Sequence, residues 1–388
     1  MANTPNIRFK GFVDDWEQRK VSEMFKVTRG YVLATTLTEE DQSDEMPYPV
    51  YSSQTKNRGL MGYYKDYLYE DAITWTTDGA NAGTVNYRDG KFYCTNVCGV
   101  LLSNEVMASQ MIAEALNNVA KRYVSYVGNP KLMNNVMSDI EIQIPISQKE
   151  QDKISEYFEV LDHLITLHQR KCDEVKQLKK FMLQKMFPKN GDLIPEIRFV
   201  GFTGVWEQRK LGEVCTRVQG NDGRMELPTL TISAGNGWMR QEDRFSSNIA
   251  GKEQKNYTLL RKGELSYNHG NSKLAKYGAV FSLQTYEEAL VPRVYHSFKV
   301  IKGNADFVEY YFATKLPDRE LGKLISSGAR MDGLLNIGYD EFMGIPLLFP
   351  TTEEQTRIAI YFRHLDYLIT LHQHKCDQLK EVKRFMLQ

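Results

Sequence analysis

The sequence predicts an α+β protein in which two strand-rich α/β domains are joined by two long antiparallel helices, with an internal pseudo-twofold repeat. Three observations predict this fold class. A 16-residue segment occurs twice, a 31-residue helical segment occurs twice, and the stretches between them contain short β-type runs broken by Gly, Asn and Asp. We expect domains at residues 1–147 and 191–350, and helices at residues 148–190 and 351–388.

The repeated segments indicate that one unit has been duplicated. Residues 5–20 read PNIRFKGFVDDWEQRK and residues 195–210 read PEIRFVGFTGVWEQRK, which are identical at 11 of 16 positions. Residues 154–184 and 358–388 are identical at 20 of 31 positions, and both contain LITLHQ followed by KCD. Since the stretches between these segments share little, we expect two copies of one scaffold that carry different surfaces.

The 31-residue segments have the hydrophobic spacing of a coiled coil. Seam residues recur at alternating steps of four and three from Ile154 to Val175, and again from Ile358 to Leu379. We expect the first helix over residues 148–185, about 55 Å long at ~1.5 Å per residue. A seam of this kind needs a partner, and the second copy supplies one, so we predict an antiparallel pair with the two domains at opposite ends.

The starts of both helices carry candidate capping residues. Ser147 is followed by Glu150 and Gln151, and Thr351 and Thr352 are followed by Glu354 and Gln355, a pattern typical of an N-cap. A further apolar stripe widens the seam, and it comprises Tyr157, Leu164, Leu167, Leu178, Phe181, Tyr361, Leu368, Leu371 and Phe385. Two paired helices would not bury all of these side chains, so we expect other protein chains to dock there.

The sequence contains no catalytic fingerprint. It has no GxxxxGK[ST] phosphate loop, no GxGxxG that follows a strand, and no HExxH pair. Asn129-Pro130 is followed by Lys131, so the NPP[YFW] motif of amino-methyltransferases is absent. We therefore predict that the chain is not an enzyme and has no catalytic residues.

We predict no metal site. The Cys94/Cys98 pair has metal-like spacing but lacks a second Cys/His pair in its domain, and the pairs His168/Cys172 and His372/Cys376 fall on the helical seam, where packing residues are expected. Five cysteines, an odd number, suit the reduced thiols of a cytoplasmic protein. No apolar run is long enough to cross a membrane, so we expect no membrane partner.

Charge is unevenly divided along the chain. The whole chain has 49 Lys+Arg and 49 Asp+Glu, a formal net charge of zero that by itself argues against nucleic-acid binding. Residues 21–147 hold 10 basic and 15 acidic side chains, a net of −5, whereas residues 211–350 hold 17 and 16, a net of +1. Neutrality therefore conceals an acidic first domain and a nearly neutral second domain.

Polar loops that combine basic, amide, hydroxyl and aromatic side chains occur at matching places in both copies. Such side chains reach base edges and phosphates, although each loop alone could equally be a solvated turn. The candidate DNA-contacting residues of the first domain are Ser52, Ser53, Lys56, Asn57, Arg58, Thr77, Asn81, Arg88 and Lys131. Those of the second domain are Asn236, Trp238, Arg240, Arg244, Asn268, His269, Asn271, Lys273, Lys276, Tyr277 and Arg330.

The alternation of variable domain and long helix resembles the specificity subunit of type I restriction–modification systems over essentially the whole chain. The markers are the repeated I-R-F-x-G-F-x-x-x-W-E-Q-R-K, the I-P before each helix and the E-Q at each helix start. The resemblance implies two target-recognition domains, each reading one half of a split double-stranded DNA sequence, and helices that fix the spacing between the half-sites. It also implies docking of two modification subunits, with restriction subunits held through them.

The same resemblance implies that no cofactor binds to this chain, and that S-adenosylmethionine, ATP and magnesium bind to the partner subunits. Because the first domain is acidic, we expect the partners to supply much of the contact with DNA phosphates. A different interpretation is a coiled-coil adaptor whose two variable domains bind proteins. A metal-dependent nuclease is a third, but no acidic cluster in the sequence supports it.

Overall fold

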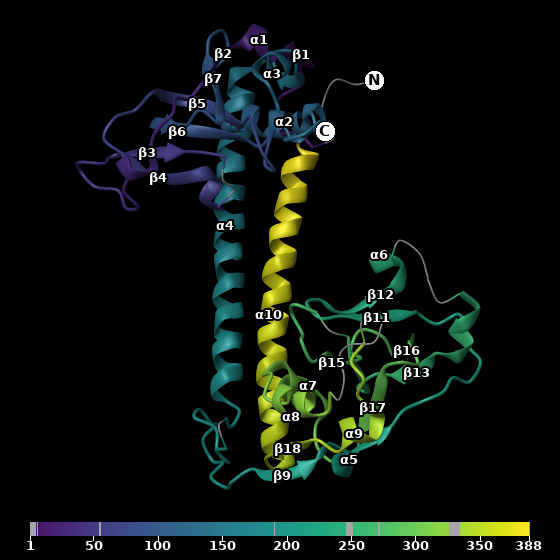
Figure 1. Cartoon of the computed structure of the whole chain (residues 1–388). Coiled ribbons are helices and arrows are strands. Elements are labelled where there is room, and N and C mark those ends of the chain that lie inside the picture. Colours follow the sequence, from purple (N-terminus) through teal and green to yellow (C-terminus); the bar gives the residue numbers. More distant parts are fainter. Residues whose placement is uncertain are drawn as a thin grey trace. The chain divides into compact units, whose positions relative to one another are not determined.

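The computed structural model describes residues 5, 7–53, 56–189, 191–245, 251–270, 272–325 and 334–387. The chain divides into two compact units, which we call unit 1 (residues 1–170 and 372–388) and unit 2 (residues 171–371). Two long helices, α4 (Gln148–Lys185) and α10 (Thr352–Phe385), are labelled in Figure 1. Each contributes residues to both units. Helix α4 has the bounds expected for the first helix, residues 148–185, and α10 lies within the expected residues 351–388.

Unit 1 is built on a six-stranded sheet of order β2-β7-β5-β6-β3-β4, in which only β3 and β6 pair in parallel. Helix α2 packs its apolar side against Ile73, Trp75 and Leu101 of this sheet. The elements are β1 Trp16–Lys20, α1 Val21–Met24, β2 Phe25–Arg29, η1 Thr35–Leu37, β3 Tyr48–Tyr51, η2 Lys56–Gly59, β4 Leu60–Tyr64, β5 Tyr69–Thr76, β6 Val85–Cys94, β7 Cys98–Ser103, α2 Gln110–Ala120, η3 Lys121–Tyr123, α3 Asn134–Ser138 and β8 Glu141–Pro145.

Unit 2 contains a four-stranded antiparallel sheet of order β10-β17-β14-β15 and the two-stranded pairs β11-β12, β13-β16 and β18-β9. Its main core joins this sheet to α7 and to the α10 residues Ile358, Phe362 and Leu365. The elements are β9 Glu207–Lys210, α5 Leu211–Val214, β10 Cys215–Arg217, β11 Leu230–Ser233, β12 Gly237–Arg240, α6 Gln241–Phe245, η4 Gly251–Asn256, β13 Thr258–Arg261, β14 Leu265–Asn268, β15 Ala279–Ser282, β16 Glu288–Val291, β17 His296–Val300, α7 Ala305–Ala313, α8 Asp318–Lys323, α9 Tyr339–Met343 and β18 Pro346–Phe349.

The inner strands of the two sheets follow one order. In unit 1 the order is β2-β7-β5-β6, in unit 2 it is β10-β17-β14-β15, and every neighbouring pair is antiparallel. A later leucine closes the corresponding loop in each unit, because Leu132 N donates to Thr77 O at 2.9 Å and Leu335 N donates to His269 O at 2.8 Å. Each of these sheets contains a hairpin of neighbouring antiparallel strands, β5–β6 in unit 1 and β14–β15 in unit 2.

A buried ion pair joins each repeated 16-residue segment to the helix that ends its copy. Arg8 binds both carboxylate oxygens of Glu150 at 2.6 and 2.7 Å, and Arg198 binds Glu354 at 2.7 Å through both oxygens. The carboxylate side chains are only 1% exposed. The predicted N-cap is present at the start of α10, where Glu354 N donates to Thr351 Oγ1 at 3.4 Å. The carboxylates of Glu150 and Glu354 have another role, because they bind arginines about 150 residues away in sequence.

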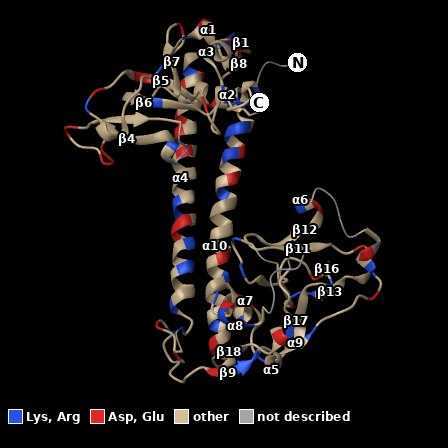
Figure 2. Ribbon diagram, viewed as in Figure 1, with Lys and Arg blue, Asp and Glu red and all other residues tan. Residues whose placement is uncertain are grey.

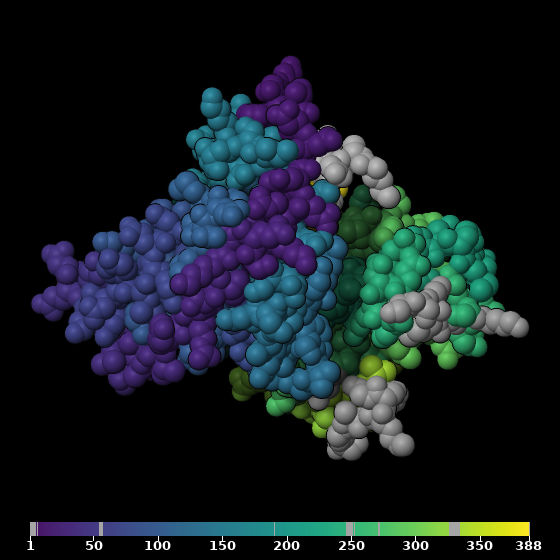
Figure 3. All heavy atoms as spheres, turned by 90° about the horizontal axis from the view of Figure 1, so that it is seen from above, coloured from purple at the N-terminus to yellow at the C-terminus, as the bar shows by residue number. Residues whose placement is uncertain are grey.

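Strand pairing completes this arrangement. β1 pairs antiparallel with β8, and β9 pairs antiparallel with β18, so each repeated segment lies beside the strand that leads into a long helix. In Figure 3 the purple N-terminal segment accordingly lies against the blue-teal part of unit 1. Trp16 and Trp206, which begin or precede these strands, are 3% and 1% exposed and belong to the two main cores.

The two long helices run antiparallel in both units. In unit 1, Lys383 of α10 binds Asp162 of α4 at 2.6 Å, and in unit 2, Lys179 of α4 binds Asp366 of α10 at 2.5 Å. Early residues of one helix thus pair with late residues of the other, as predicted. The two contacts occupy corresponding positions of the 31-residue repeat.

The seam cysteines are packing residues in the structure. Cys376 Sγ donates to Ile165 O in unit 1, and Cys172 Sγ donates to Ile369 O in unit 2. Both thiols are fully buried. Within the described ranges, no group of three or more His, Cys, Asp or Glu side chains is placed to hold a metal ion.

Outside the seam, both helices expose apolar side chains. Figure 2 shows that Lys, Arg, Asp and Glu residues are spread along both helices. Tyr157, Leu167, Leu178, Phe181, Leu371 and Phe385 of the predicted stripe are exposed, whereas Leu164, Tyr361 and Leu368 are half-buried. The helix pair therefore leaves an apolar surface available. No helix among the described residues is long and apolar enough to span a bilayer.

Candidate nucleic-acid interface

One face of the unit 1 sheet is polar where β5 and β6 pair. Successive side chains of a strand point to opposite faces, so Ile73 and Trp75 enter the main core while Thr74 and Thr76 point away from it. On β6, Arg88 takes the same face as Thr74, because its Nε donates to Thr74 Oγ1 at 2.9 Å. Two adjacent strands thus place hydroxyl groups and a guanidinium side by side.

Arg88 is buried, with only 5% of its surface exposed. Its guanidinium lies 3.7 Å from the centre of the Tyr51 ring, a favourable cation–π distance. Burial lowers the pKa of Arg88 to about 10, so the side chain remains charged near neutral pH.

The loop after β3 covers this polar face. Ser52 and Thr95 are joined through their hydroxyl groups at 3.1 Å, and Asn57 and Arg58 have φ values of 49° and 55°, which lie in the left-handed region that few side chains adopt. Between loop and sheet lies a cavity of about 160 Å³. It is lined by Ser52, Arg58, Thr74, Trp75, Thr76, Thr84, Asn86, Arg88 and Cys98.

The remaining predicted residues of the first domain lie near this loop or at the next turn. Asn81 Nδ2 donates to Ser53 O at 3.1 Å, which ties the β5–β6 turn to the loop after β3. Thr77 is buried and its hydroxyl donates to Asp78, whose carboxylate also binds the half-exposed Lys131 at 3.6 Å. The side chain of Lys56 lies outside the described residues.

In unit 2 the structure brings two predicted loops together at one carbonyl. Ile232 O accepts from Arg244 Nη1 at 2.7 Å and from Asn268 Nδ2 at 3.3 Å. Trp238 Nε1 donates to Ser282 O at 3.1 Å, so the β11–β12 hairpin also contacts β15. The predicted groups at 236–244 and at 268 therefore form one surface, although they are far apart in sequence.

His269 has a different environment from the one expected of a loop residue. It is 5% exposed, and its ring nitrogens contact two carbonyl oxygens, Leu335 O at 2.7 Å and Val294 O at 2.8 Å. Both nitrogens are used internally, so His269 joins two loops and offers no group to a base edge. The neighbouring His296 ring stacks on it, and burial lowers the pKa of His296 to about 4.

The other predicted residues of the second domain are surface groups. Asn236, Arg240, Lys273 and Lys276 are exposed, and Tyr277 is half-buried with its ring 5.2 Å from the Lys276 ammonium. Arg240 forms an exposed ion pair with Glu242 at 2.9 Å. Asn271 and Arg330 lie outside the described residues.

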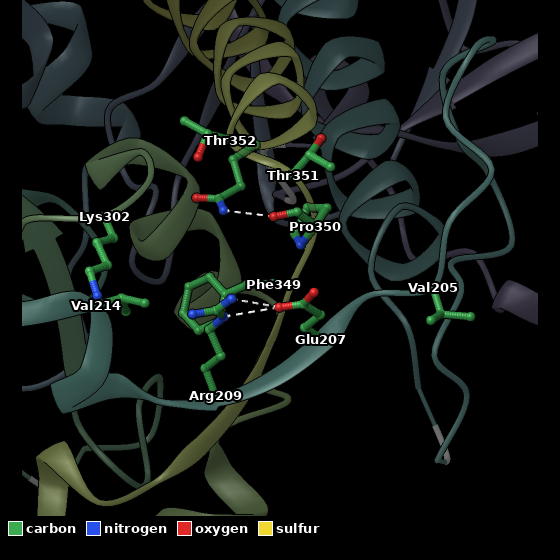
Figure 4. A pocket seen from close by; sticks show the side chains of 10 residues that line it. Val205, Glu207, Arg209, Val214, Lys302, Phe349, Pro350, Thr351 and Thr352 are labelled. Carbon is green, nitrogen blue, oxygen red and sulfur yellow. Dashed lines mark hydrogen bonds and ion pairs between the residues drawn. The ribbon is translucent and has the colours of Figure 1, made fainter.

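A cavity of about 300 Å³ lies at the start of α10 (Figure 4). Its charged residues include Arg209, which binds Glu207 at 2.6 Å, and its amide Gln355 donates to Pro350 O. The first copy repeats these contacts, with an Arg19–Glu17 ion pair and a hydrogen bond from Gln151 to Pro145 O. This cavity belongs to the scaffold shared by both copies, so it is a poor candidate for sequence recognition.

Sequence reasoning missed the threonines and the amide that surround Arg88. Thr74, Thr76 and Asn86 occupy alternating positions on two strands that read as hydrophobic from their neighbours. The signal that could have found them is their period of two, which places polar residues on one face of a predicted hairpin.

Comparisons with known proteins point in one direction. A family model described as the type I restriction modification DNA specificity domain matches residues 13–177. The N-terminal part of a putative type I specificity subunit of Mycoplasma pneumoniae is 39% identical over 139 residues, which make up 35% of this chain and 72% of that protein. The specificity subunit of the type I restriction enzyme MpnII of the same organism is 33% identical over 149 residues, 37% of this chain and 44% of that protein.

Among solved structures, the S subunit of a type I restriction–modification system from M. genitalium has a TM-score of 0.62. The similarity covers 99% of this chain and 98% of that chain, at 14% sequence identity. At that identity the likeness concerns the fold.

Proposed function

This chain belongs to the family of type I restriction–modification specificity subunits, and from that premise we propose that it selects the DNA sequence for such a complex. Each unit reads one half of a bipartite target, and the paired helices fix the separation of the half-sites. In this proposal, catalysis belongs to the partner subunits and this chain supplies sequence recognition. A two-part target suits a duplicated protein because DNA half-sites about one helical turn apart face the same side of the duplex.

The observation that carries this proposal is the recurrence of one inner strand order in two units whose loops differ. The order β2-β7-β5-β6 of unit 1 is matched by β10-β17-β14-β15 of unit 2. At equivalent loop positions, however, Thr77 of unit 1 corresponds to His269 of unit 2, and Lys131 corresponds to Leu334. Different side chains on one scaffold support reading of two different half-sites.

The exposed apolar side chains of the helices support docking of partner subunits. We assign Tyr157, Leu178 and Phe181 of α4 and Phe385 of α10 to contacts with two modification subunits, which would in turn hold the restriction subunits. S-adenosylmethionine, ATP and magnesium then belong to those partners. The −5 charge of residues 21–147 supports a division of labour in which the partners bind most phosphates.

Mapping of DNA methylation in cells with and without the protein tests the proposal. We expect a bipartite methyl-adenine motif that disappears when the gene is removed. Replacement of residues 211–350 by another domain of this family should change one half-site and leave the other intact. A change in both half-sites would show that the units do not read separately.

Charge reversal on the helices tests the docking surface. Lys176 and Lys380 are exposed at equivalent positions of the repeat, so their replacement by Glu should weaken co-purification of the modification subunit without loss of folding. Lys65→Glu, an exposed change in unit 1 away from the helices, is the matched control. Equal recovery of the modification subunit with all variants would contradict this assignment.

A protein-binding adaptor with two variable domains is the second candidate. It would share the scaffold and the exposed helix stripe, but it would leave the methylation pattern of the cell unchanged. The mapping experiment therefore separates the two functions directly.

A further inference from the structure

Arg88 stands apart from the other buried cation of the described chain. Among the described residues, Arg88 and Lys383 are the only buried arginine and lysine side chains, at 5% and 7% exposed. Lys383 has two carboxylate partners, Glu114 at 2.8 Å and Asp162 at 2.6 Å. Arg88 has no carboxylate within 4.0 Å in the described part of the chain, and Thr74 is its one hydrogen-bond partner there.

An unpaired buried cation is costly to a folded protein. Removal of a charge from water carries a penalty of several kcal/mol unless an opposite charge or several hydrogen bonds replace the solvent. For Arg88, the Tyr51 ring and the Thr74 hydroxyl replace only part of the lost hydration. A guanidinium has five N–H donors, and only the Nε–H of Arg88 is used here. The N–H groups of Nη1 and Nη2 are therefore available to an acceptor.

The cavity beside Arg88 has the lining of an oxyanion site. Thr74, Thr76, Thr84 and Ser52 bring hydroxyl groups, and Asn86 brings an amide. Arg58 lies at the same cavity and is exposed, so it adds a second positive charge at the entrance. A volume of about 160 Å³ holds several waters or one tetrahedral anion.

We propose that this cavity binds one phosphate of the DNA backbone and that Arg88 fixes its position. The inference rests on the proposed function, since it assumes that unit 1 lies on DNA. A phosphate fits better than a base edge, because a phosphate projects from the duplex and has only acceptors, whereas a base edge lies within a groove. A single phosphate contact of this kind sets the register of an otherwise acidic unit on the duplex.

The first experiment uses inorganic phosphate as the probe and needs no DNA. Thermal unfolding of the full chain is followed with and without phosphate, against chloride at the same ionic strength. Phosphate should raise the Tm of the wild type and of Arg122→Met, an exposed arginine of the same unit, and should not raise that of Arg88→Met. Without phosphate, Arg88→Met should be as stable as the wild type, because the variant lacks a desolvated charge.

The second experiment measures affinity for two duplexes, one with the mapped methylation motif and one without it, over a range of salt concentration. Arg88→Met should weaken binding to both duplexes by about tenfold and reduce the slope of log affinity against log salt by about 0.9, the value of one phosphate contact. Arg88→Lys keeps the positive charge but lacks the paired N–H donors of a guanidinium, so we expect a loss of DNA affinity smaller than that of Arg88→Met.

The outcomes separate the inference from the proposed function. If the wild type prefers its motif and Arg88→Met binds both duplexes with unchanged slope, the phosphate assignment is wrong while the function stands. A loss of affinity confined to the motif duplex would show that Arg88 contacts a base, and it would overturn the phosphate assignment. A lower Tm of Arg88→Met in the absence of phosphate would overturn it too, because the cation would then be needed for folding. A wild type that binds both duplexes equally contradicts the proposed function itself.

Discussion

Replacement of Arg8 by Met should destabilise unit 1 far more than a surface change. The Arg8 guanidinium holds Glu150 through two hydrogen bonds of 2.6 and 2.7 Å, and the carboxylate is 1% exposed while the arginine is 14% exposed. The substitution leaves a buried carboxylate without its cation. Loss of one partner of a buried ion pair costs about 3–5 kcal/mol, which for a unit of this size lowers Tm by roughly 6–20 °C.

The loss should also depend on the partner carboxylate. Arg8→Met/Glu150→Met should recover much of the loss, because no charge remains buried.

Hydrogen exchange followed by mass spectrometry reads this effect locally. Arg8→Met should accelerate exchange in β1, β8 and the first turns of α4, while β9 and β18 remain protected. Arg198→Met, which breaks the equivalent pair with Glu354, should give the converse pattern and is the matched control. A double variant as unstable as the single one would contradict this prediction, because the loss of stability would then come from the loop around Arg8 and not from the buried charge.

Three further predictions concern other buried groups. Lys383→Met should lower the free energy of unfolding by about 3 kcal/mol, because Lys383 is 8% exposed and has two carboxylate partners. Lys179→Met, at the equivalent position, should lower it by about 1 kcal/mol or less, since Asp366 is 35% exposed. Urea unfolding compares the two variants, and equal losses would contradict the role of burial. The pKa of His296 is lowered from 6.5 to about 4, so its contribution to the free energy of unfolding is fully present above pH 6.5. That contribution falls by roughly 3 kcal/mol as pH decreases to 4, because the unfolded chain takes up the proton first. In His296→Phe, the amide exchange rates of β14 and β17 should no longer depend on pH in this way. All five cysteines are buried, and burial raises the pKa of Cys98 to about 11 and that of Cys94 further. Iodoacetamide should therefore label the native protein slowly and the unfolded protein at five sites. Rapid labelling of Cys94 in the native protein would show that its strand opens.

The elements that could be predicted from sequence are those with a strong local signal. The seam from Ile154 to Val175 has a helical period, and α4 has the predicted bounds, while α10 lies within the predicted residues 351–388. The hairpins β5–β6 and β14–β15 were visible as β-type runs around a turn. These features depend on residues a few positions apart.

The features that could not be predicted depend on contacts between distant residues. Glu150 sits where a helix cap is expected, but its partner Arg8 is 142 residues away, and no local rule favours that pairing. His269 lies in a polar stretch that reads as an exposed loop, and it is buried because Leu335 and Val294 supply carbonyl oxygens to its ring. Arg88 is predicted as a DNA contact because it lies in a polar stretch that combines basic, amide, hydroxyl and aromatic side chains. Only the structure shows that it is buried, with no carboxylate within 4.0 Å among the described residues.

The division of each long helix between two units has a consequence for how the chain is made. Residues 372–387 complete the core of unit 1, where Leu379, Val382 and Met386 pack against the first unit's sheet and helices. A ribosome that has finished the first 170 residues must add about 200 more before these side chains emerge. At a synthesis rate of ~5–20 residues per second, roughly 10–40 s pass before residues 372–387 can complete the core of unit 1. During that interval its seam residues Ile154, Phe158 and Leu161 lack their final partners, so we expect nascent chains to depend on chaperones, and damage to unit 2 to prevent maturation of unit 1.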